Sequence, residues 1–555
     1  MSTDLLFEHF DTFATAPDGI ARLREMILQL AVQGKLGTQD ENDEPASVLL
    51  ERLKKSEKIN KKCKSTKIDE SQEEDFPYLI PKNWIWIKFN EIVIDVQSGF
   101  ACGERDSRGI VQLRMNNINP RGDFIWDKIL RVPFDEVLKQ KYELKSGDVV
   151  FNNTNSLELV GKSGLFKGFT EPIVYSNHFT RLRFDESSID PAYVTIWLHY
   201  QWNSKIFEKI CNKWIGQAAV NGTKLLTFLF PLPPTAEQHR IVEKVDRLMS
   251  LCDELEAKQQ QERAGCLKLG TASLVGLQNV ESPEEFERLW AQVCDAFDLI
   301  LDCPENVGVL RQTILRLAVQ GKLGTQDERD EPADVLLDDI RKEKARSIKN
   351  GKPQKEKPLK FVNGTDLPFK IPNKWVWTYF GKITFNRDGE RKPLEKAVRA
   401  TRHGAYDYYG ASGVIDTVDD YLFDKPLLLI GEDGANLVNR STPIAFIAHG
   451  KFWVNNHAHV LDGISFEFLR YLEIYINSIN LQPYITGMAQ PKMNQAKMNS
   501  IPVPLPPLAE QERIIAKVDA LMALCNHLDV RLKERADLQG KYANTMIKQV
   551  NAEVK

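Results

Sequence analysis

The side chains that could carry chemistry in this sequence occur in short groups, and none completes a common catalytic signature. Gly161-Lys162-Ser163 resembles the end of a phosphate loop, but the position five residues before Gly161 is Ser156 rather than glycine. His457 and His459 stand at a spacing that could seat a metal on a strand. No third ligand is indicated by spacing, so a satisfied buried pair is the favoured interpretation, and no metal site is expected. The sequence predicts a non-enzyme with no catalytic residues.

Polar, planar and cationic side chains gather near glycines in two separate stretches. Arginine and asparagine make two-pronged contacts to guanine and adenine edges, whereas lysine and serine suit phosphates. In the first stretch the candidates for DNA contact are Arg105, Arg108, Arg114, Asn116, Asn153, Asn155, Lys162, Ser163, Asn177 and His178. In the second they are Arg387, Arg391, Lys392, Arg402, Tyr408, Ser412, Asn436, Asn455 and His457. Residue by residue, the construction of turns is the competing interpretation, because Asn, Ser and Gly are common turn residues.

Charge and cysteine usage limit the class of protein. The 73 basic and 77 acidic residues nearly balance, which excludes a protein held to nucleic acid everywhere by charge. The eight cysteines include no Cys-x-x-Cys pair, so neither a zinc framework nor a secreted disulfide scaffold is indicated. The amino terminus lacks the pattern of a signal peptide, and no apolar run reaches the roughly 18 residues of a membrane span. We expect a cytoplasmic, multidomain protein.

The segments expected to position these candidate residues occur twice along the chain. LREMILQLAVQGKLGTQDENDEPASVLLERL from Leu23 matches LRQTILRLAVQGKLGTQDERDEPADVLLDDI from Leu310 at about 23 of 31 positions. IPKNWIWIKF from Ile80 matches IPNKWVWTYF from Ile371, and the Leu-Pro-Pro segments from Leu232 and Leu505 also match. The chain is therefore a tandem duplication, with its seam near 280–285.

The two bodies enclosed by these matching segments are unlike each other. The interval from Trp375 to Pro504 is 18 residues shorter than that from Trp84 to Pro231. Near-identical frames imply equivalent docking surfaces, whereas unlike bodies imply two unlike ligands or two unlike halves of one ligand. By count, the first body carries about three net positive charges and the second about one, which is too little to prove nucleic-acid binding.

An apolar seam follows each Leu-Pro-Pro segment. Its members recur at spacings of three and four residues, which is the a/d pattern of a helix that packs as a coiled coil. The seams comprise Ile241, Val245, Leu248, Cys252 and Leu255 in the first copy, and Ile514, Val518, Leu521, Cys525 and Leu528 in the second. Ordinary core packing is the alternative. Because both copies share one phase, we expect the two long helices to pair with each other, antiparallel, as a spacer between the bodies. The first of these helices is expected from about Ala236 to Arg263.

These segments together resemble the specificity subunit of a type I restriction-modification enzyme. The resemblance is carried by LAVQGKL at Leu30–Leu36 and Leu317–Leu323, and by the Leu-Pro-Pro-x-x-Glu-Gln-x-x-Ile starts at Leu232 and Leu505. YYGASGVIDTVDDYLFD from Tyr408, LLLIGEDGANL from Leu427 and NNHAHVL from Asn455 support it in the second body. The lead-in Gly487-x-x-Gln490-Pro-Lys-Met-Asn494 fits the family, whereas Gly216-Gln217-Ala-Ala-Val-Asn221 departs from it.

The resemblance implies an α+β architecture in which two mixed α/β target-recognition domains hang from conserved helical regions. The expected boundaries are residues 1–76 for an N-terminal helical region, 77–233 for the first recognition domain, 234–365 for a central helical region, 366–505 for the second recognition domain and 506–555 for a C-terminal helical region. Each recognition domain would read one half of a split double-stranded DNA site. Two methyltransferase subunits and two motor-nuclease subunits would be the partners, and S-adenosylmethionine, ATP and Mg would belong to them.

Two other functions compete with this interpretation. A coiled-coil interaction scaffold would bind proteins rather than DNA, and it would show no salt-dependent duplex binding. An enzyme with a site around Glu432 and His457 would turn over substrate as an isolated chain. The base sequence of a DNA site does not follow from any of these patterns, because loop geometry decides which side chain reaches which base edge.

Overall fold

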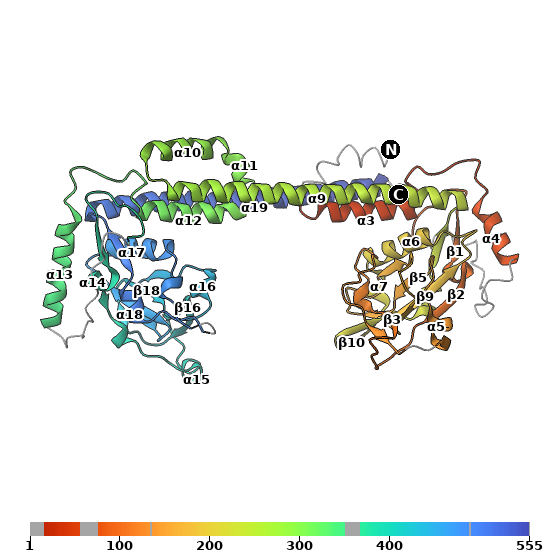
Figure 1. Ribbon diagram of the computed structural model, residues 1–555, viewed down its shortest axis with the longest axis horizontal. Helices are drawn as coiled ribbons and strands as arrows, with labels where there is room; N and C mark the ends of the chain where they lie inside the picture. The colour runs from red at the N-terminus through yellow and green to blue at the C-terminus, as the bar shows by residue number, and fades with distance from the viewer. Residues whose placement is uncertain (1–15, 56–75, 134–135, 350–366, 488–489, 554–555) are drawn as a thin grey trace. The chain divides into compact units, whose positions relative to one another are not determined.

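The computed structural model describes residues 16–133, 136–349, 367–487 and 490–553, except 56–75, and divides into two compact units (Figure 1). Unit 1 extends to Gln260 and resumes at Arg535, and unit 2 runs from Gln261 to Glu534. The two long helices, α9 (Thr235–Asn279) and α19 (Leu508–Glu553), each begin in one unit and end in the other. Among the described residues, no helix is long and apolar enough to cross a membrane.

In unit 1, helices form a frame and short strands form a mixed α/β body, as the sequence predicts. The frame contains α3 (Gly19–Val32), α4 (Ala46–Lys55) and the first part of α9. The elements of the body are β1 (Ile85–Lys88), η2 (Phe89–Glu91), β2 (Val93–Ser98), β3 (Ile110–Leu113), η3 (Met115–Asn117), β4 (Arg131–Val132), α5 (Glu136–Tyr142), β5 (Val149–Asn152), β6 (Thr154–Asn155), β7 (Ser163–Leu165), β8 (Ile173–Tyr175), β9 (Phe179–Phe184), α6 (Pro191–Asn203), α7 (Ile206–Ile210), β10 (Asn212–Trp214), β11 (Gln217–Ala219), α8 (Gly222–Leu225) and β12 (Leu229–Leu232).

Four small sheets make up the first body. Their strand orders are β2-β9-β5-β7, β4-β3-β8, β10-β11-β6 and β1-β12. Helix α6 packs on α3, and it begins where Pro191 follows Asp190, whose carboxylate accepts a hydrogen bond from the Ala192 N–H at 2.8 Å. Because β1 pairs with β12, the first and last strands of the body meet beside the frame, and the loops between the other strands are left to carry ligand contacts.

Unit 2 repeats the frame with a different body. Its frame contains the second part of α9, α10 (Pro283–Asp295), α11 (Phe297–Leu301), α12 (Glu305–Val319), α13 (Ala333–Lys349) and the first part of α19. Its body contains β13 (Val376–Tyr379), α14 (Phe380–Ile383), β14 (Phe385–Asn386), η4 (Asp388–Glu390), α15 (Lys396–Arg399), β15 (Tyr406–Gly410), β16 (Gly413–Val418), β17 (Phe423–Asp424), β18 (Leu427–Gly431), α16 (Asn436–Asn439), β19 (Ala445–Ala448), β20 (Lys451–Val454), β21 (Ala458–Asp462), α17 (Phe466–Ser478), η5 (Gln482–Tyr484), α18 (Gln495–Asn499) and β22 (Pro502–Leu505).

The sheets of the second body are β14-β21-β18-β19, β16-β15-β20-β17 and β13-β22. The pair β13-β22 corresponds to β1-β12, and α17 packs on α12 as α6 packs on α3. The remaining strands have a different order from those of the first body. The duplication predicted from the sequence is therefore visible in the frame and in the strand pair that closes each body.

Each frame helix ends in the same tight turn. Gly34 and Gly321, two residues after α3 and α12, have φ of +67° and +70°. A Cβ built on Gly34 would lie 2.4 Å from Pro81, and one on Gly321 would lie 2.4 Å from Pro372. Glycine is required here both by the left-handed backbone and by the close approach of the proline.

The apolar seams have neighbours that the heptad pattern did not predict. Ile241, Val245, Leu248 and Cys252 are buried in one core with α3, and Leu255 packs against that core. In unit 2, Ile514, Val518 and Cys525 are buried in one core with α12, with Leu521 and Leu528 packed against it. Each seam therefore shares a core with the preceding frame helix of its own copy, and the core of unit 1 also contains Ala543 and Met546 of α19. A heptad stripe defines which face of a helix is apolar, but it does not identify the helix that covers it.

The first long helix is also longer than expected. The sequence predicts about Ala236 to Arg263, whereas α9 continues to Asn279, a length of 45 residues. Beyond Arg263 the helix carries Leu274 and Leu277, which are buried in the core of unit 2. The apolar stripe therefore continues after a polar middle segment, and the polar segment concealed that continuity in the sequence.

Candidate nucleic-acid interface

A buried carboxylate joins the body of unit 1 to its frame. Glu237, at the start of α9, accepts hydrogen bonds from the Trp84 indole N–H at 2.8 Å and from the Thr38 hydroxyl at 3.0 Å. The Gln39 amide donates to it at 3.0 Å. Burial raises the pKa of Glu237, and the hydrogen bonds from Trp84 and Thr38 oppose that rise. We call Glu237 with these three partners the first joint.

Unit 2 contains the same joint, built from the duplicated residues. Glu510 accepts from the Trp375 indole N–H at 2.8 Å, from the Thr325 hydroxyl at 2.9 Å and from the Gln326 amide at 2.8 Å. We call this set the second joint. The three repeated segments of the sequence each supply part of the joint: the Thr and Gln, the Trp, and the Glu. The repeated residues are therefore those that attach each body to its frame.

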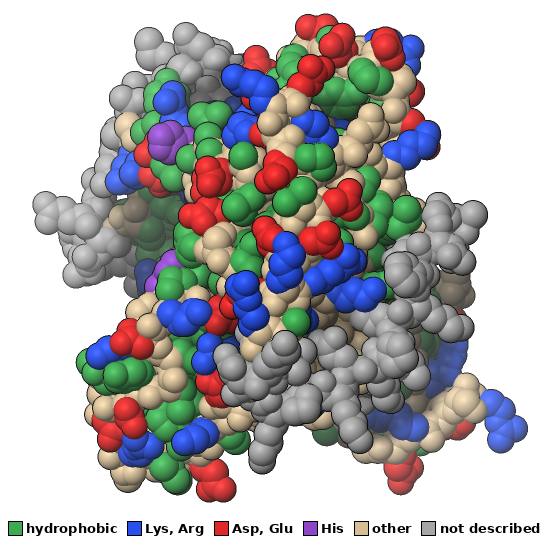
Figure 2. Space-filling view, turned by 90° about the vertical axis from the view of Figure 1, so that its left-hand side faces the viewer, with side chains coloured by type: hydrophobic (Ala, Val, Ile, Leu, Met, Phe, Trp, Pro, Cys, Tyr) green, Lys and Arg blue, Asp and Glu red, His purple; other side chains and the backbone are tan. Residues whose placement is uncertain are grey.

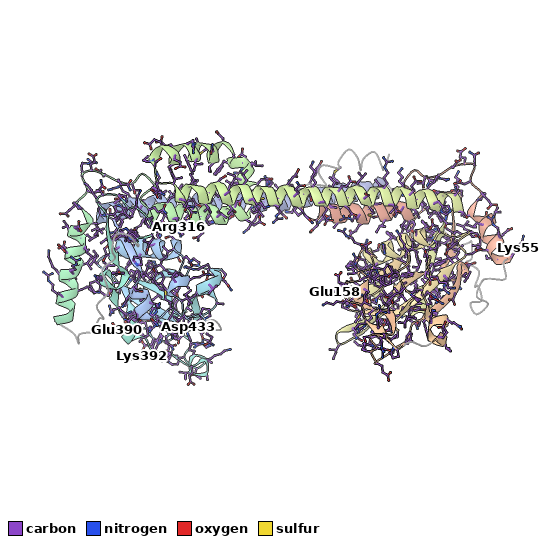
Figure 3. The ribbon with its side chains drawn as sticks, in the orientation of Figure 1. Lys55, Glu158, Arg316, Glu390, Lys392 and Asp433 are labelled. Carbon is purple, nitrogen blue, oxygen red and sulfur yellow. The ribbon has the colours of Figure 1, made fainter. Side chains whose placement is uncertain are left out.

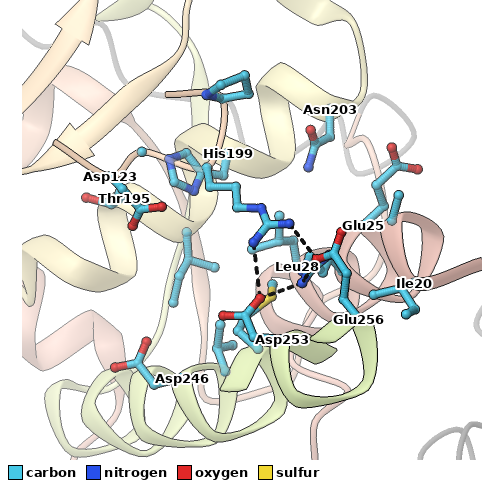
Figure 4. Close-up of a pocket in the computed structure, with 18 of the residues that line it drawn as sticks. Ile20, Glu25, Leu28, Asp123, Thr195, His199, Asn203, Asp246, Asp253 and Glu256 are labelled. Atoms are coloured by element: carbon cyan, nitrogen blue, oxygen red, sulfur yellow. Dashed lines mark hydrogen bonds and ion pairs between the residues drawn. The ribbon is translucent and has the colours of Figure 1, made fainter. Parts of the chain in front are cut away.

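A second set of polar contacts ties the frame helices together. The Arg24 guanidinium on α3 donates to Asp253 at 2.5 Å and to Glu256 at 2.8 Å on α9 (Figure 4). Arg311 on α12 makes the corresponding contacts on α19, with Asn526 at 2.8 Å and Asp529 at 2.5 Å. These contacts fix the register between each long helix and the shorter helix beside it.

Unit 1 adds a contact from the body. Arg121, in the loop between η3 and β4, donates to Asp253 at 3.2 Å and to Glu256 at 2.7 Å (Figure 4). It borders a pocket of about 1010 Å³ between the body, α3 and α9, where burial lowers the pKa of His199. The wall also contains Glu25, whose pKa burial raises. Acidic and basic side chains both line the pocket, and its arginines Arg24 and Arg121 already pair with Asp253 and Glu256 on α9. We therefore interpret these contacts as an attachment of the body to the frame.

In the first body the fold brings five of the predicted DNA-contact residues into one region. The Asn153 backbone N–H donates to the His178 carbonyl at 2.9 Å, and Asn155 lies two residues further on in β6. Burial lowers the pKa of His178, and the neighbouring Arg114 lowers it further. Asn177, beside His178, is exposed. We call Arg114, Asn153, Asn155, Asn177 and His178 the first polar patch.

The other predicted residues of the first body divide into exposed and buried groups. Arg105 and Arg108 are exposed in the loop between β2 and β3, and Asn116 is exposed in η3. Lys162 and Ser163 are buried: Lys162 Nζ donates to the Ile118 carbonyl, and Ser163 Oγ donates to the Gly161 carbonyl at 3.1 Å. Burial also lowers the pKa of Lys162. Contrary to the sequence interpretation, these two side chains serve the fold and are not presented to a phosphate.

In the second body, several predicted residues are committed to internal contacts. Arg391 donates to Glu432 at 2.9 Å and to the Ala458 carbonyl at 2.6 Å, and Arg387 pairs with Asp462 at 2.9 Å. Both nitrogens of the buried His459 are occupied, by Asp388 at 2.6 Å and by the Met493 carbonyl at 2.9 Å. Desolvation acts to raise the pKa of Glu432, but Arg391, His459 and Lys492 outweigh it, and the net shift is downward.

Tyr408, Asn455 and Asn436 also have structural roles. Tyr408 is fully buried, and its hydroxyl accepts from the Leu394 N–H at 3.0 Å. Asn455 is buried and accepts from the His457 N–H at 2.8 Å, while Asn436 accepts from the Thr442 N–H at 3.1 Å. These are corrections to the sequence interpretation: Asn455 and Asn436 bond to the backbone of turns, which was the competing interpretation for asparagine, and Tyr408 is a buried residue of strand β15.

Four predicted residues of the second body remain accessible. Lys392 and Ser412 are exposed, and His457 is exposed while bonded to Asp433 at 2.9 Å (Figure 3). Arg402 is partly exposed, pairs with Asp419 at 2.7 Å and lies over the Trp453 ring. We call Lys392, Arg402, Ser412 and His457 the second polar patch. In the part of the chain that the structure describes, no cluster of three or more His, Cys, Asp or Glu side chains could hold a metal ion.

Sequence reasoning did not identify Glu237, Glu510 or Arg121. The two glutamates were visible as the Glu of both Leu-Pro-Pro-x-x-Glu motifs, but nothing in the sequence paired them with Trp84 and Trp375. Arg121 has no counterpart in the repeat, and no sequence pattern marked it as a contact residue.

On the side of the molecule shown in Figure 2, basic and acidic side chains are interspersed, which agrees with the small net charge.

Comparison with known proteins decides the class. A family model described as the type I restriction modification DNA specificity domain matches the chain twice, at residues 113–263 and 383–536, which is more than half of its length. The chain belongs to this family. It is the DNA-recognition subunit of a type I restriction-modification system, and subunits of this family are not catalytic.

Two curated relatives match this specificity subunit almost end to end. The specificity subunit of the type I restriction enzyme EcoEI from Escherichia coli is 29% identical over 565 residues, covering 95% of this chain and 93% of that protein. The EcoAI specificity subunit, also from Escherichia coli, is 29% identical over 570 residues with the same coverage. Among solved structures, the HsdS subunit from Thermoanaerobacter tengcongensis is 17% identical with a TM-score of 0.39, covering 85% of this chain and 98% of that one.

Proposed function

We propose that each body of this specificity subunit reads one half of a split double-stranded DNA site, and that the frames recruit the partner subunits. Two equivalent frames suit two copies of one partner, so two methyltransferase subunits would bind, and two motor-nuclease subunits would complete the restriction complex. S-adenosylmethionine, ATP and Mg would be bound by those partners. This chain would thus set the DNA sequence that is recognised, and the partner subunits would catalyse methylation and cleavage.

The observation that carries the proposal is the contrast between the joints and the bodies. The first and second joints use the same residue types at nearly the same distances, whereas the sheets that they hold have different strand orders. Equivalent attachments would present two different recognition surfaces to one ligand in equivalent ways. A protein scaffold would gain nothing from a conserved attachment of dissimilar bodies unless both addressed one continuous partner.

We propose DNA contacts only for candidates whose side chains are neither buried nor fully used by hydrogen bonds within the body. In the first body they are Arg114, Asn177 and His178 of the first polar patch, together with Arg105, Arg108 and Asn116. The Asn153 amide donates to Thr180 Oγ1 and the Asn155 amide to Asn152 Oδ1, both at 3.0 Å, so these two side chains serve the fold. In the second body they are the residues of the second polar patch. Asparagine and arginine in these sets suit base edges, and Lys392 and Ser412 suit phosphates. Burial and the neighbouring Arg114 lower the pKa of His178 and so favour its neutral ring, which can both donate and accept a hydrogen bond.

We also propose that α9 and α19 act as a spacer, paired antiparallel, that holds the two bodies in step. Both helices continue without a break from one unit into the other. At about 1.5 Å per residue, 45 residues span roughly 68 Å, which is about two turns of B-DNA at roughly 34 Å per turn. An unbroken helix keeps a fixed distance between its two ends, because hydrogen bonds within its own backbone set the rise per residue.

Exchanging one body tests the proposal directly. Residues 376–505, from β13 to β22, would be replaced by the corresponding segment of a related specificity subunit, and the methylated sequence would be read in cells that also carry the methyltransferase. We expect one half of the methylated site to change and the other half to stay. The matched control exchanges residues 85–232 and should change the opposite half. If neither exchange altered the methylated sequence, the bodies would not be the readers.

A further inference from the structure

A short hairpin at the edge of the first body carries two exposed apolar side chains. Strands β10 and β11 pair antiparallel, with Trp214 opposite Gln217, so that Ile215 and Gly216 form the tip. Figure 1 labels β10 at the end of the body. Trp214 is 61% exposed and Ile215 is fully exposed, and a Cβ built on Gly216 would meet no atom within 4 Å. The tip therefore projects away from the rest of the unit.

The hairpin is continuous with the first polar patch. Strand β11 pairs with β6, and the register places Ala218 opposite Asn155 and Ala219 opposite Thr154. The Val220 N–H donates to the Asn153 carbonyl at 2.9 Å. A ligand on the first polar patch therefore lies beside β11, where Ala218, opposite Asn155, is two residues from Gly216 in the apolar tip.

The sequence of the hairpin and its flanking residues is locally basic, which favours a polyanion. Between Glu208 and Glu237 the sequence contains Lys209, Lys213 and Lys224 and no acidic residue. Lys209 and Lys213 are exposed, and Lys213 lies in β10 beside Trp214. This local excess of positive charge contrasts with the near balance of the whole chain, and it is the arrangement expected next to phosphates.

From this placement we propose that the hairpin Asn212–Ala219 is a DNA wedge, in which Ile215 and Trp214 enter between base pairs of the first half-site and partly unstack them. Lys213 then contacts a phosphate beside the opened step. Apolar side chains on DNA-binding proteins unstack base steps in this way, and aromatic rings stack on the exposed base faces. This inference rests on the proposed function, because it requires the first body to lie on DNA.

The wedge adds sequence preference without a hydrogen bond to a base. Pyrimidine–purine steps unstack more easily than others, so a wedge favours a half-site that places such a step under the tip. In the corresponding segment of the second body, Thr486 pairs with Lys492, and the sequence from 486 to 492 contains no tryptophan or isoleucine. The device therefore belongs to the first body and is not part of the duplicated frame.

Fluorescence of 2-aminopurine tests the wedge in the complex of this chain with its methyltransferase subunits. Once methylome sequencing has given the site, the probe is placed at successive positions of the first half-site other than the methylated adenine. We expect a local rise in fluorescence at one step with the unsubstituted chain. Ile215→Ser should abolish that rise and weaken DNA binding roughly tenfold, while Ile215→Leu should restore both.

The controls separate the wedge from other roles of the hairpin. Trp290→Ser removes an exposed tryptophan from α10 in unit 2 and should change neither signal. If Ile215→Ser kept the fluorescence rise and the affinity, the wedge would be refuted while half-site reading stood. If Ile215→Ser instead prevented the methyltransferase subunits from co-purifying, the tip would be a protein-docking site, and the wedge would again be refuted. Failure of the body exchange to alter the methylated site would refute the proposed function itself.

Discussion

At the scale of single residues, the most consequential side chain is a glutamate buried inside unit 1. Glu237 is fully buried, and its carboxylate is surrounded by the Trp84 indole, the Thr38 hydroxyl and the Gln39 amide. These donors come from two other segments of the chain, so one side chain fixes the start of α9, the end of the α3 turn and the entry to β1. Glu510 does the same in unit 2.

Replacing Glu237 by alanine should destabilise unit 1 by about 1–3 kcal/mol, because the buried Trp84 and Thr38 donors lose their acceptor. Chemical denaturation of the full chain, followed by circular dichroism, measures the change. Glu243→Ala is the matched control, since Glu243 is an exposed residue on the same helix. Glu510→Ala should cost a similar amount in unit 2. Equal midpoints for Glu237→Ala and Glu243→Ala would show that the first joint does not hold the body.

At the scale of elements, the frame is a set of helices whose apolar stripes face each other within each unit. Ile241, Val245 and Cys252 pack with α3 in unit 1, and Ile514, Val518 and Cys525 pack with α12 in unit 2. At the polar edge of each helix pair, an arginine of the shorter helix bonds to the long helix: Arg24 to Asp253 in unit 1 and Arg311 to Asp529 in unit 2. The bodies then rest on the frame through α6 and α17.

Thiol reactivity reports on this packing. Burial raises the pKa of the Cys252 and Cys525 thiols, and both side chains are buried, whereas Cys294 on α10 is exposed. Because the thiolate is the reactive form, Cys294 should be alkylated by iodoacetamide at pH 8 at least about tenfold faster than Cys252 or Cys525. Peptide mass spectrometry of the native chain measures the three rates. Rapid labelling of Cys252 would contradict the packing of α3 on α9.

At the scale of the whole molecule, the two bodies are linked through α9 and α19, because each of these helices belongs to both units. A split DNA site requires the two readers to act at a fixed separation. In the proposed function that separation is encoded by helix length, while the sequence of each half-site is encoded by one body.

Inserting one helical turn after Lys258 in α9, with a matching turn in the middle of α19, should change the number of unread base pairs between the half-sites. Four residues add about 6 Å, which is roughly two base pairs at about 3.4 Å each. Methylome sequencing reads the spacing directly. A four-residue insertion within residues 56–75 serves as a control, because it lies outside both long helices and should leave the spacing as it was. Unchanged spacing after insertion in both long helices would refute the spacer.

The sequence alone determined the duplication and the frame helices, and its motifs carried the resemblance that implied the family and the mixed α/β class of the bodies. These features are recorded in local patterns: repeated segments, apolar periodicity, and glycine and proline at helix ends. Only the tertiary structure decided which helix covers each seam, and which candidates remain free to meet DNA. Lys162 and Tyr408 looked like ligand-binding residues but are buried, whereas Glu237, which sequence reasoning did not identify, is the buried acceptor of the first joint. Burial and hydrogen-bond partners depend on segments far apart in the chain, and no local pattern encodes which of those segments meet.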